Sequence, residues 1–470
     1  MTAPTRALAL AVLGCGLLAA AVRLPRLGAP GLAEAEQAAF VETQGFSAHA
    51  ALPAGTPFTA DALPRRGDLL DAARHASVSP LHAAGLAVWT RVAGTSEGAL
   101  RLPSALAGAL AAALAALVAG WVAGAAAAAW AGVFVALSPI FTLASREAVP
   151  DAPLVLLLLL ALALFVHASQ SGRAGTSVAL GLVLGFVASA GIPAFAAVAL
   201  VPLLALGHRP DRRAAAARAA AAAVGAVAAL ALLGLARSPL DFGEIPTWIP
   251  AATASGIVRC TGASFTRVAG LEYHLAVSHA RYVVPLTALV VGLMAWGARR
   301  LPGWARGPLA AGAVLPFALG AVLALATGRV LPLQATRLVA ALPFVALLVG
   351  AGLGSLRGWR AWASGAAVAG TLAIFLALAL ARHDYETSPT RAVAREVAGC
   401  STAGAVVAVR RPLDLLALAA WDVPGPFVLR PPRDPVPEGP AIVVGPSSTC
   451  VAGGATCAAF PPCAAASARR

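Results

Sequence analysis

The stretch Ser145–Asp151, SREAVPD, decides the fold because it sets two acids and an arginine between two long apolar runs. No charged residue occurs between Leu102 and Ser145, and Ala152–Val166 is apolar throughout. Runs of this length and composition predict helices that cross a membrane. Charges placed at the boundary of such helices usually have a function. We therefore expect Ser145–Asp151 to be a functional loop at a membrane surface.

The composition of the whole chain indicates a polytopic membrane protein. Hydrophobic residues make up 59% of the 470 positions, charged residues only 11%, and the mean hydropathy is +0.82, which is too apolar for a water-soluble globule. The net charge is +14, and all 34 basic residues are arginine. These arginines cluster in short connections between apolar runs, whereas a nucleic-acid surface needs a water-exposed basic face with interleaved aromatics. We therefore expect membrane lipids, and no nucleic acid, among the partners.

With about 20 apolar residues per span, the sequence predicts about eleven transmembrane helices. The first apolar run is expected to be an uncleaved span. The expected spans lie near residues 7–22, 102–120, 124–144, 152–168, 175–190, 192–207, 214–235, 282–298, 308–327, 336–355 and 361–381.

A cytoplasmic N-terminus brings the arginine-rich connections at 209–213, 299–306 and 357–360 to the cytoplasmic side, as the positive-inside rule expects. The same topology places the loop Ser145–Asp151 outside, together with residues 23–100, residues 236–281 and the tail. We therefore predict that the charged loop and the acid-rich first loop share the outer face of the membrane.

The chain is expected to divide into a transmembrane domain, residues 1–382 with a first outer loop at about 23–100, and an extracytoplasmic domain, residues 383–470. In the tail, a helical pattern at 390–399 and strand patterns at 405–409 and 441–444 are separated by proline-rich turns. This order predicts a small C-terminal α/β domain.

Three segments carry a resemblance to a known family. They are Gly94–Gly108 (GTSEGALRLPSALAG), Ala136–Pro139 (ALSP) and Ser145–Val155 (SREAVPDAPLV). Together they resemble the integral-membrane glycosyltransferases of the GT-C type, in the branch of protein O-mannosyltransferases and bacterial aminoarabinose transferases. The similarity is best over about 23–170 and continues more weakly over Arg329–Leu353.

This resemblance implies a fold and an activity. The fold would be that of a mainly α, polytopic GT-C protein in the bacterial inner membrane. The activity would be transfer of a sugar, with inversion, from a polyprenyl-phosphate donor to a lipid, glycan or protein acceptor on the outer face.

In that family the first outer loop carries an acidic pair, usually Asp-Glu, whose aspartate is taken to be the catalytic base. Two registers are open in this chain, because the pair falls either on Ala33/Glu34 or on Ala35/Glu36. In both registers alanine stands where the family has aspartate. Asp151 matches the second acidic position of the family directly.

A second departure from the family pattern lies at Val78-Ser-Pro80. The family commonly has a histidine before its prolines at this place. His75 and His82 lie nearby but out of register.

Sugar transfer from a lipid phosphate needs a carboxylate within hydrogen-bond reach of the acceptor nucleophile and cations over the departing phosphate. The resemblance and this chemistry together select the candidates. Those for the carboxylate role are Glu34, Glu36 and Asp151, and those for binding the substrate or its phosphate are Arg146, Glu147 and Arg337, of which the two arginines suit the phosphate.

Each candidate also has a structural interpretation. Glu34 and Glu36 fit a solvated acidic loop, and Asp151 after Pro150 fits the first turn of a helix, where an acid favours the dipole. Arg146 and Glu147 fit an ion pair with each other or with headgroups. Arg337 fits a side chain that reaches from a span end to the interface.

The sequence leaves the cofactor open and assigns a scaffold role to Arg101. No metal ligand set is evident, although two carboxylates such as Glu36 and Asp151 suit a divalent cation.

Two other functions stay open at this point. The missing aspartate favours a catalytically silent homologue that binds a lipid-linked sugar or serves an envelope assembly complex. A transporter is the second alternative, and it would show internal repeats and ionisable residues within its spans.

Overall fold

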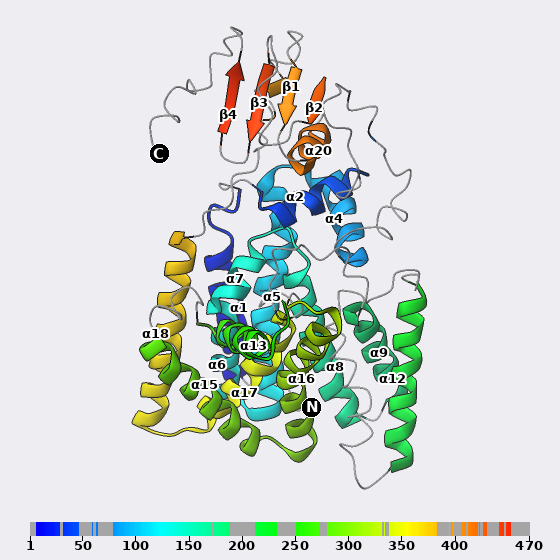
Figure 1. Ribbon diagram of the computed structural model, residues 1–470. Helices are drawn as coiled ribbons and strands as arrows, with labels where there is room; N and C mark the ends of the chain where they lie inside the picture. Colours follow the sequence, from blue (N-terminus) through cyan, green and yellow to red (C-terminus); the bar gives the residue numbers. More distant parts are fainter. Residues whose placement is uncertain are drawn as a thin grey trace. The chain divides into compact units, whose positions relative to one another are not determined.

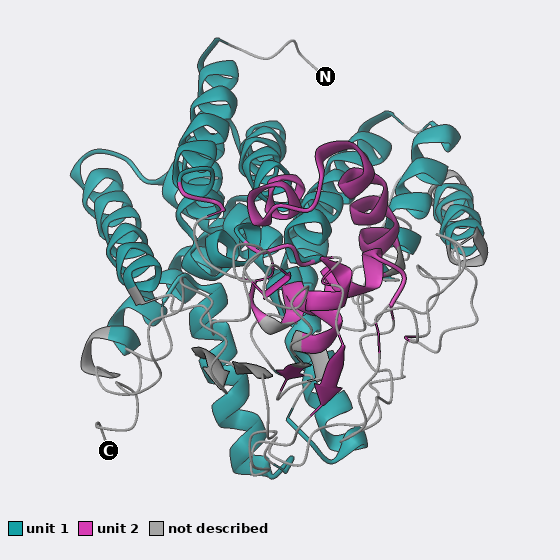
Figure 2. Cartoon of the chain, turned by 90° about the horizontal axis from the view of Figure 1, so that it is seen from above, with its two compact units in different colours: residues 1–25, 104–146, 150–383 teal, residues 26–103, 147–149, 384–470 magenta. Residues whose placement is uncertain are grey.

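The computed structural model describes residues 6–28, 32–46, 59, 63, 79–171, 173–188, 212–232, 251–271, 280–330, 333, 338–382, 394, 397–398, 406–409, 412–421, 423, 426–429, 441–445 and 448–452. These residues fall into two compact units (Figure 2). Unit 1 comprises residues 1–25, 104–146 and 150–383, and unit 2 comprises residues 26–103, 147–149 and 384–470. Each unit is built from segments that are distant in the sequence.

Unit 1 is helical in its described parts (Figure 1). Its helices are α1 (Arg6–Arg23), most of α5 (Glu97–Ala123), α6 (Ala125–Leu137), α7 (Pro139–Ser145), α8 (Asp151–Ser171), α9 (Ala174–Ala188), α12 (Arg212–Leu232), α13 (Ala254–Val268), α15 (Ala280–Arg300), α16 (Gly303–Thr327), α17 (Leu342–Ser355), preceded by the 3₁₀ turn Val339–Ala341, and α18 (Trp359–Arg382).

Six described helices are long and apolar enough to cross a membrane, and the bent pair α6 and α7 makes a seventh span if counted as one. The six are Arg6–Arg23, Glu97–Ala123, Asp151–Ser171, Val283–Arg300, Gly303–Thr327 and Trp359–Ala381. Shorter apolar helices at Ala174–Ala188, Ala216–Ala229 and Val339–Ser355 coincide with three further expected spans. The expected span at 192–207 lies outside the described residues. The chain is thus a membrane protein, and the count of eleven spans stays a prediction.

The span expected as one helix over 124–144 is broken. α6 and α7 meet at Ser138 with a bend of 61°. Pro139 causes the break, because it has no N–H to donate to the carbonyl of Val135 and disfavours a helical conformation at the residue before it.

Arg23 stabilises the broken end of α6. Its side chain is fully buried, and its guanidinium donates to the carbonyls of Ala136 at 2.9 Å and Val135 at 3.1 Å. The same guanidinium lies 5.1 Å from the centre of the Phe141 ring. A cation at a helix C-terminus satisfies unpaired carbonyls and suits the negative end of the dipole. The last residue of α1 therefore caps a different helix, 112 residues further along the chain.

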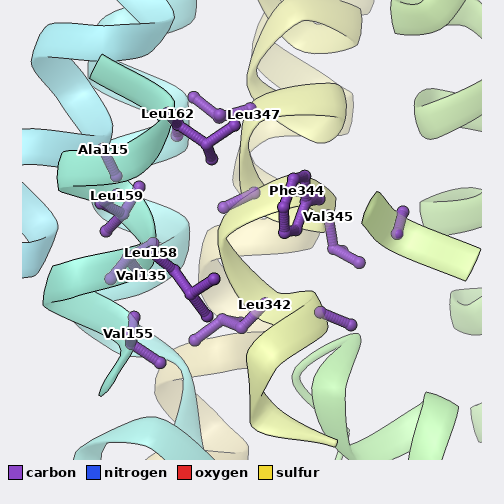
Figure 3. Close-up of a cluster of buried hydrophobic side chains, with 14 of the residues drawn as sticks. Ala115, Val135, Val155, Leu158, Leu159, Leu162, Leu342, Phe344, Val345 and Leu347 are labelled. Carbon is purple, nitrogen blue, oxygen red and sulfur yellow. The ribbon is translucent and has the colours of Figure 1, made fainter. Parts of the chain in front are cut away.

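The core of unit 1 extends over most of its helices, and Figure 3 shows the part where α8 and α17 face each other. Leu158 and Leu162 of α8 point toward Leu342 and Leu347 of α17. All four side chains are at most 3% exposed. The Phe344 ring requires a glycine at position 312 of α16, because a Cβ there would lie 2.1 Å from the ring. This packing fixes α8, whose first residue is Asp151.

Unit 2 combines α2 (Glu34–Thr43), α4 (Pro80–Ala93) and the start of α5 with the tail. The tail contributes β1 (Val406–Val409), α20 (Pro412–Ala420), β2 (Phe427–Leu429), β3 (Ala441–Gly445) and β4 (Ser448–Ala452). The sheet has the order β2-β1-β3-β4, in which β1 pairs in parallel with β2 and β3, and β3 pairs antiparallel with β4.

Strands β1 and β3 lie where the sequence predicted strands, whereas α20, β2 and β4 were not predicted. Only residues 394, 397 and 398 of the expected helix at 390–399 are described. The division of the chain at residue 382 into two domains stays a prediction.

Helix α2 packs directly on α20. The rings of Phe40 and Trp421 lie 5.0 Å apart, and Phe40 is fully buried in a cluster that also contains Leu100 and Leu416. The described parts of residues 26–103 and of the tail therefore share one hydrophobic core within unit 2. Helix α2, which carries Glu34 and Glu36, therefore packs against α20 of the tail.

Candidate functional site

Glu36 of α2 is fully buried in unit 2. Its Oε1 accepts hydrogen bonds from Arg101 Nε at 2.7 Å and from the backbone N–H of Ala148 at 2.8 Å. Its Oε2 accepts from Arg101 Nη2 at 2.7 Å and from the backbone N–H of Ala33 at 2.8 Å. Each oxygen thus accepts two charge-assisted hydrogen bonds, which use the four acceptor positions of a carboxylate.

The partner of Glu36, Arg101, is also fully buried. Its guanidinium binds the carboxylate through two parallel N–H groups and donates a further bond from Nη1 to the Leu27 carbonyl at 3.0 Å. A buried ion pair of this kind is tolerated only when its geometry is good and its remaining groups are bonded. Glu36 and Arg101 therefore join the start of α2 to α5.

His82 and Glu36 hold the two sides of one peptide segment in the charged loop. Glu36 accepts the N–H of Ala148, and His82 Nε2 lies 3.1 Å from the carbonyl oxygen of Ala148. His82 is on α4, which starts at Pro80 in the first helical turn and ends at Gly94, whose φ of +81° favours glycine. Trp89 of the same helix donates to the Ala99 carbonyl at 2.8 Å. Both sides of Ala148 are thus fixed within unit 2.

Burial lowers the pKa of His82 from 6.5 to about 4, although the hydrogen bond to Ala148 favours the charged form. The ring is therefore neutral near pH 7, with its proton on Nε2 and donated to the Ala148 carbonyl.

The depressed pKa predicts a loss of stability in acid. The pKa of His82 in the folded state lies below its value in the unfolded state. The contribution of neutral His82 to the free energy of unfolding is therefore fully present above about pH 6.5, and it is lost as the pH falls toward 4. The shift corresponds to about 3 kcal/mol over that window. Unfolding of the wild type should be compared with that of His82→Gln at pH 7.5 and at pH 5. The wild type should lose more stability than the variant, and equal losses would contradict the predicted shift.

Arg146 follows α7 in unit 1 and is half-buried. Its Nη1 donates to the carbonyls of Val22 at 3.2 Å and Arg23 at 3.1 Å, at the C-terminal end of α1. In the described part of the chain, its Nε and Nη2 form no hydrogen bond. One side of this guanidinium is thus anchored to the protein, and the other has donors left for an anion.

Asp151 is the first residue of α8 and is half-buried. The carbonyl of Pro150 accepts the N–H of Leu154 at 2.9 Å, so the helix begins at the position expected from the sequence. The positive end of the helix dipole favours a negative charge at Asp151. Glu147, in unit 2, is also half-buried.

Residues 77–237 match the family model of dolichyl-phosphate-mannose-protein mannosyltransferases. Two structures of ArnT from Cupriavidus metallidurans are similar to the chain. The structure bound to undecaprenyl phosphate has 17% identity and a TM-score of 0.60, with 90% of this chain and 86% of that chain covered. The apo structure has 15% identity and a TM-score of 0.60, with 92% of each chain covered.

The chain has the GT-C fold. This confirms the resemblance seen in the sequence. An oligosaccharyltransferase from Archaeoglobus fulgidus, tethered with an acceptor peptide, shows the same likeness at 12% identity and a TM-score of 0.53, with 90% of this chain and 64% of that chain covered. No curated protein matches the sequence.

Two predicted site residues are not fully covered by the part of the chain that the structure describes. Arg337 lies outside the described residues, and so does the side chain of Glu34, whose backbone begins α2. No group of three or more His, Cys, Asp or Glu side chains gathers among the residues that the structure describes. A divalent cation therefore stays a sequence-based expectation.

The sequence did not predict two contacts that organise this region. Arg101 is the last charge before a long apolar run, and an arginine at the start of a buried helix requires a carboxylate partner. The position of Arg101 therefore indicates a buried carboxylate partner, but it does not indicate which Asp or Glu supplies it. His82 gave no such signal, because its partner is a backbone carbonyl.

Proposed function

We propose that the chain is a membrane glycosyltransferase that moves a sugar from a polyprenyl-phosphate donor to a lipid, glycan or protein acceptor. The main support is the GT-C fold, which extends over nine-tenths of the chain in the comparison with an ArnT that is bound to undecaprenyl phosphate. In the proposed localisation, a bacterial inner membrane, the N-terminus is cytoplasmic and the tail and first loop are extracytoplasmic.

In the proposed reaction, the acceptor oxygen or nitrogen forms a bond to the anomeric carbon of the sugar. The bond from that carbon to the phosphate oxygen breaks, and the electron pair leaves with the polyprenyl phosphate. A single displacement of this kind inverts the anomeric centre. The acceptor proton passes to a carboxylate, and cations stabilise the phosphate as it leaves.

We assign the carboxylate role to Asp151 or Glu34 and the phosphate role to Arg146, with Arg337 as a further candidate for the phosphate and Glu147 as a candidate for contact with the rest of the substrate. The unused donors on the guanidinium of Arg146 support its role, since arginine binds phosphate through two parallel N–H groups. Glu36 takes a different part in this proposal. Because its four acceptor positions are filled, we assign it the positioning of α2 and of the Ala148 peptide rather than the role of base.

A second function, binding of a lipid-linked sugar without transfer, has one specific observation in its favour. If the family pair falls on Ala35/Glu36, the place of the usual aspartate is taken by Ala35, which is exposed beside the buried Glu36. In that register the acidic pair itself retains only Glu36, the acid with a structural role. Glu34 then becomes the residue that separates the two functions.

Purified protein in proteoliposomes should be tested with a panel of radiolabelled polyprenyl-phosphate sugars and an envelope extract as the acceptor source. Labelled product and released polyprenyl phosphate are expected with at least one donor. Binding of a donor without release of polyprenyl phosphate would support the silent function. A loss of transfer in Glu34→Gln, at unchanged stability, would assign the base to the first loop.

A further inference from the structure

Two helix connections in unit 1 form a surface that is rich in arginine and tryptophan. They are the α15–α16 and α17–α18 connections, and both lie at the lower edge of the helices in Figure 1. No Asp or Glu occurs anywhere in residues 296–362. The exposed arginines of this surface are Arg299, Arg300, Arg306, Arg357 and Arg360, and its exposed tryptophans are Trp296, Trp359 and Trp362. We call this set the arginine–tryptophan patch.

The two connections are tied together by side chains. Trp296 at the end of α15 donates from Nε1 to Ser355 Oγ at the end of α17, at 2.9 Å. The guanidinium of Arg300 lies 4.5 Å from the ring centre of Trp296, which is within cation–π distance. Trp296 therefore joins the two helix ends and also fixes one cation of the patch.

The arginines of the patch do not serve one another as partners. Arg306 folds back so that Nη2 donates to the carbonyls of Arg299 and Leu301 at the end of α15. In the described part of the chain, none of the five arginines forms an ion pair. Arg300, Arg357 and Arg360 thus present guanidinium groups that are exposed and have no carboxylate.

The exposed tryptophans indicate the depth of the patch in a membrane. Trp359 is 75% exposed and Trp362 78% exposed, at the start of the span helix α18. Tryptophan at the end of a span favours the boundary between acyl chains and headgroups. The neighbouring guanidinium groups are then at the level of the lipid phosphates.

We propose that the arginine–tryptophan patch binds anionic phospholipids, with the phosphate of the headgroup held by Arg300, Arg357 and Arg360. Charge complementarity selects this occupant, because clusters of arginine next to a span attract acidic headgroups and the guanidinium fork matches a phosphate. Arginines that only set the topology would need no fixed geometry. Here Trp296 orients Arg300 and brings the second connection beside it.

The test is lipid retention by the full-length protein. Protein purified in a mild detergent is equilibrated with equal amounts of phosphatidylglycerol and phosphatidylcholine, and the bound lipids are counted by native mass spectrometry. The wild type should retain phosphatidylglycerol in preference to phosphatidylcholine. Removing two arginines in Arg300→Gln/Arg360→Gln should reduce this preference by roughly 10-fold or more.

Two further variants separate the site from general charge effects. Trp296→Leu preserves every charge, and hence the topology signal, but removes the support of Arg300, so it should also weaken the preference several-fold. Arg91→Gln removes an exposed arginine on α4 in unit 2 and should retain the wild-type preference. Equal retention of both lipids by the wild type would overturn the proposal, and so would a wild-type preference in Trp296→Leu.

Discussion

Replacing Arg101 with leucine is expected to lower the free energy of unfolding by about 3–5 kcal/mol. The variant leaves the carboxylate of Glu36 buried with only the backbone N–H groups of Ala33 and Ala148 as donors. An isolated charge in such a place costs far more than a lost surface ion pair. Denaturant unfolding in detergent, monitored by tryptophan fluorescence, measures the effect.

The matched control is Arg91→Leu, which removes an exposed arginine of the same unit and should change stability by less than about 0.5 kcal/mol. The double variant Glu36→Met/Arg101→Leu should regain much of the loss, because it removes both charges at once. If Arg101→Leu unfolds like the control, the buried pair does not hold α2 to α5.

Asp151→Asn is expected to reduce the rate of sugar transfer by about 10²–10⁴-fold. Asparagine has the same shape and is accepted at the start of a helix, and loss of the charge that favours the dipole costs about 0.3–1 kcal/mol. The turnover number at saturating donor should therefore fall while the unfolding transition changes little. This combination separates a functional acid from a helix cap.

Glu97→Gln provides the comparison, because Glu97 is likewise a half-buried acid in the first turn of a helix, α5. It should retain most of the wild-type turnover. A wild-type rate in Asp151→Asn would remove Asp151 from the proposed mechanism and leave Glu34 as the candidate.

The helices of unit 1 were largely predictable, because their residues are apolar over nearly a full membrane thickness. The break at Ser138 was not, since the residues on both sides of Pro139 are as apolar as those of a continuous span. In the tail, strands β1 and β3 have clear valine-rich patterns, but α20 is a short apolar run that periodicity does not distinguish from a strand.

The sequence singled out Glu36 and Arg146 as candidates, but it did not predict the contacts that the structure gives them. The local richness in acids fits a solvated acidic loop around Glu36, yet Glu36 is fully buried. Its partners lie 65 residues away at Arg101 and 112 residues away at Ala148. Contacts over such separations depend on the packing of whole helices, which a single sequence does not display. The position of Arg146 beside the end of α1 has the same origin.

The capping of α6 by Arg23 has a consequence for the biogenesis of the protein. α1 is synthesised more than one hundred residues before the carbonyls of Val135 and Ala136 that its last side chain binds. Until α6 has been made and inserted, Arg23 must stay hydrated or bound to headgroups, because a guanidinium without partners is costly in the bilayer. Pairing of Arg23 with the broken span must therefore wait until α6 has been made, which couples the final position of α1 to the insertion of a helix 112 residues further along the chain.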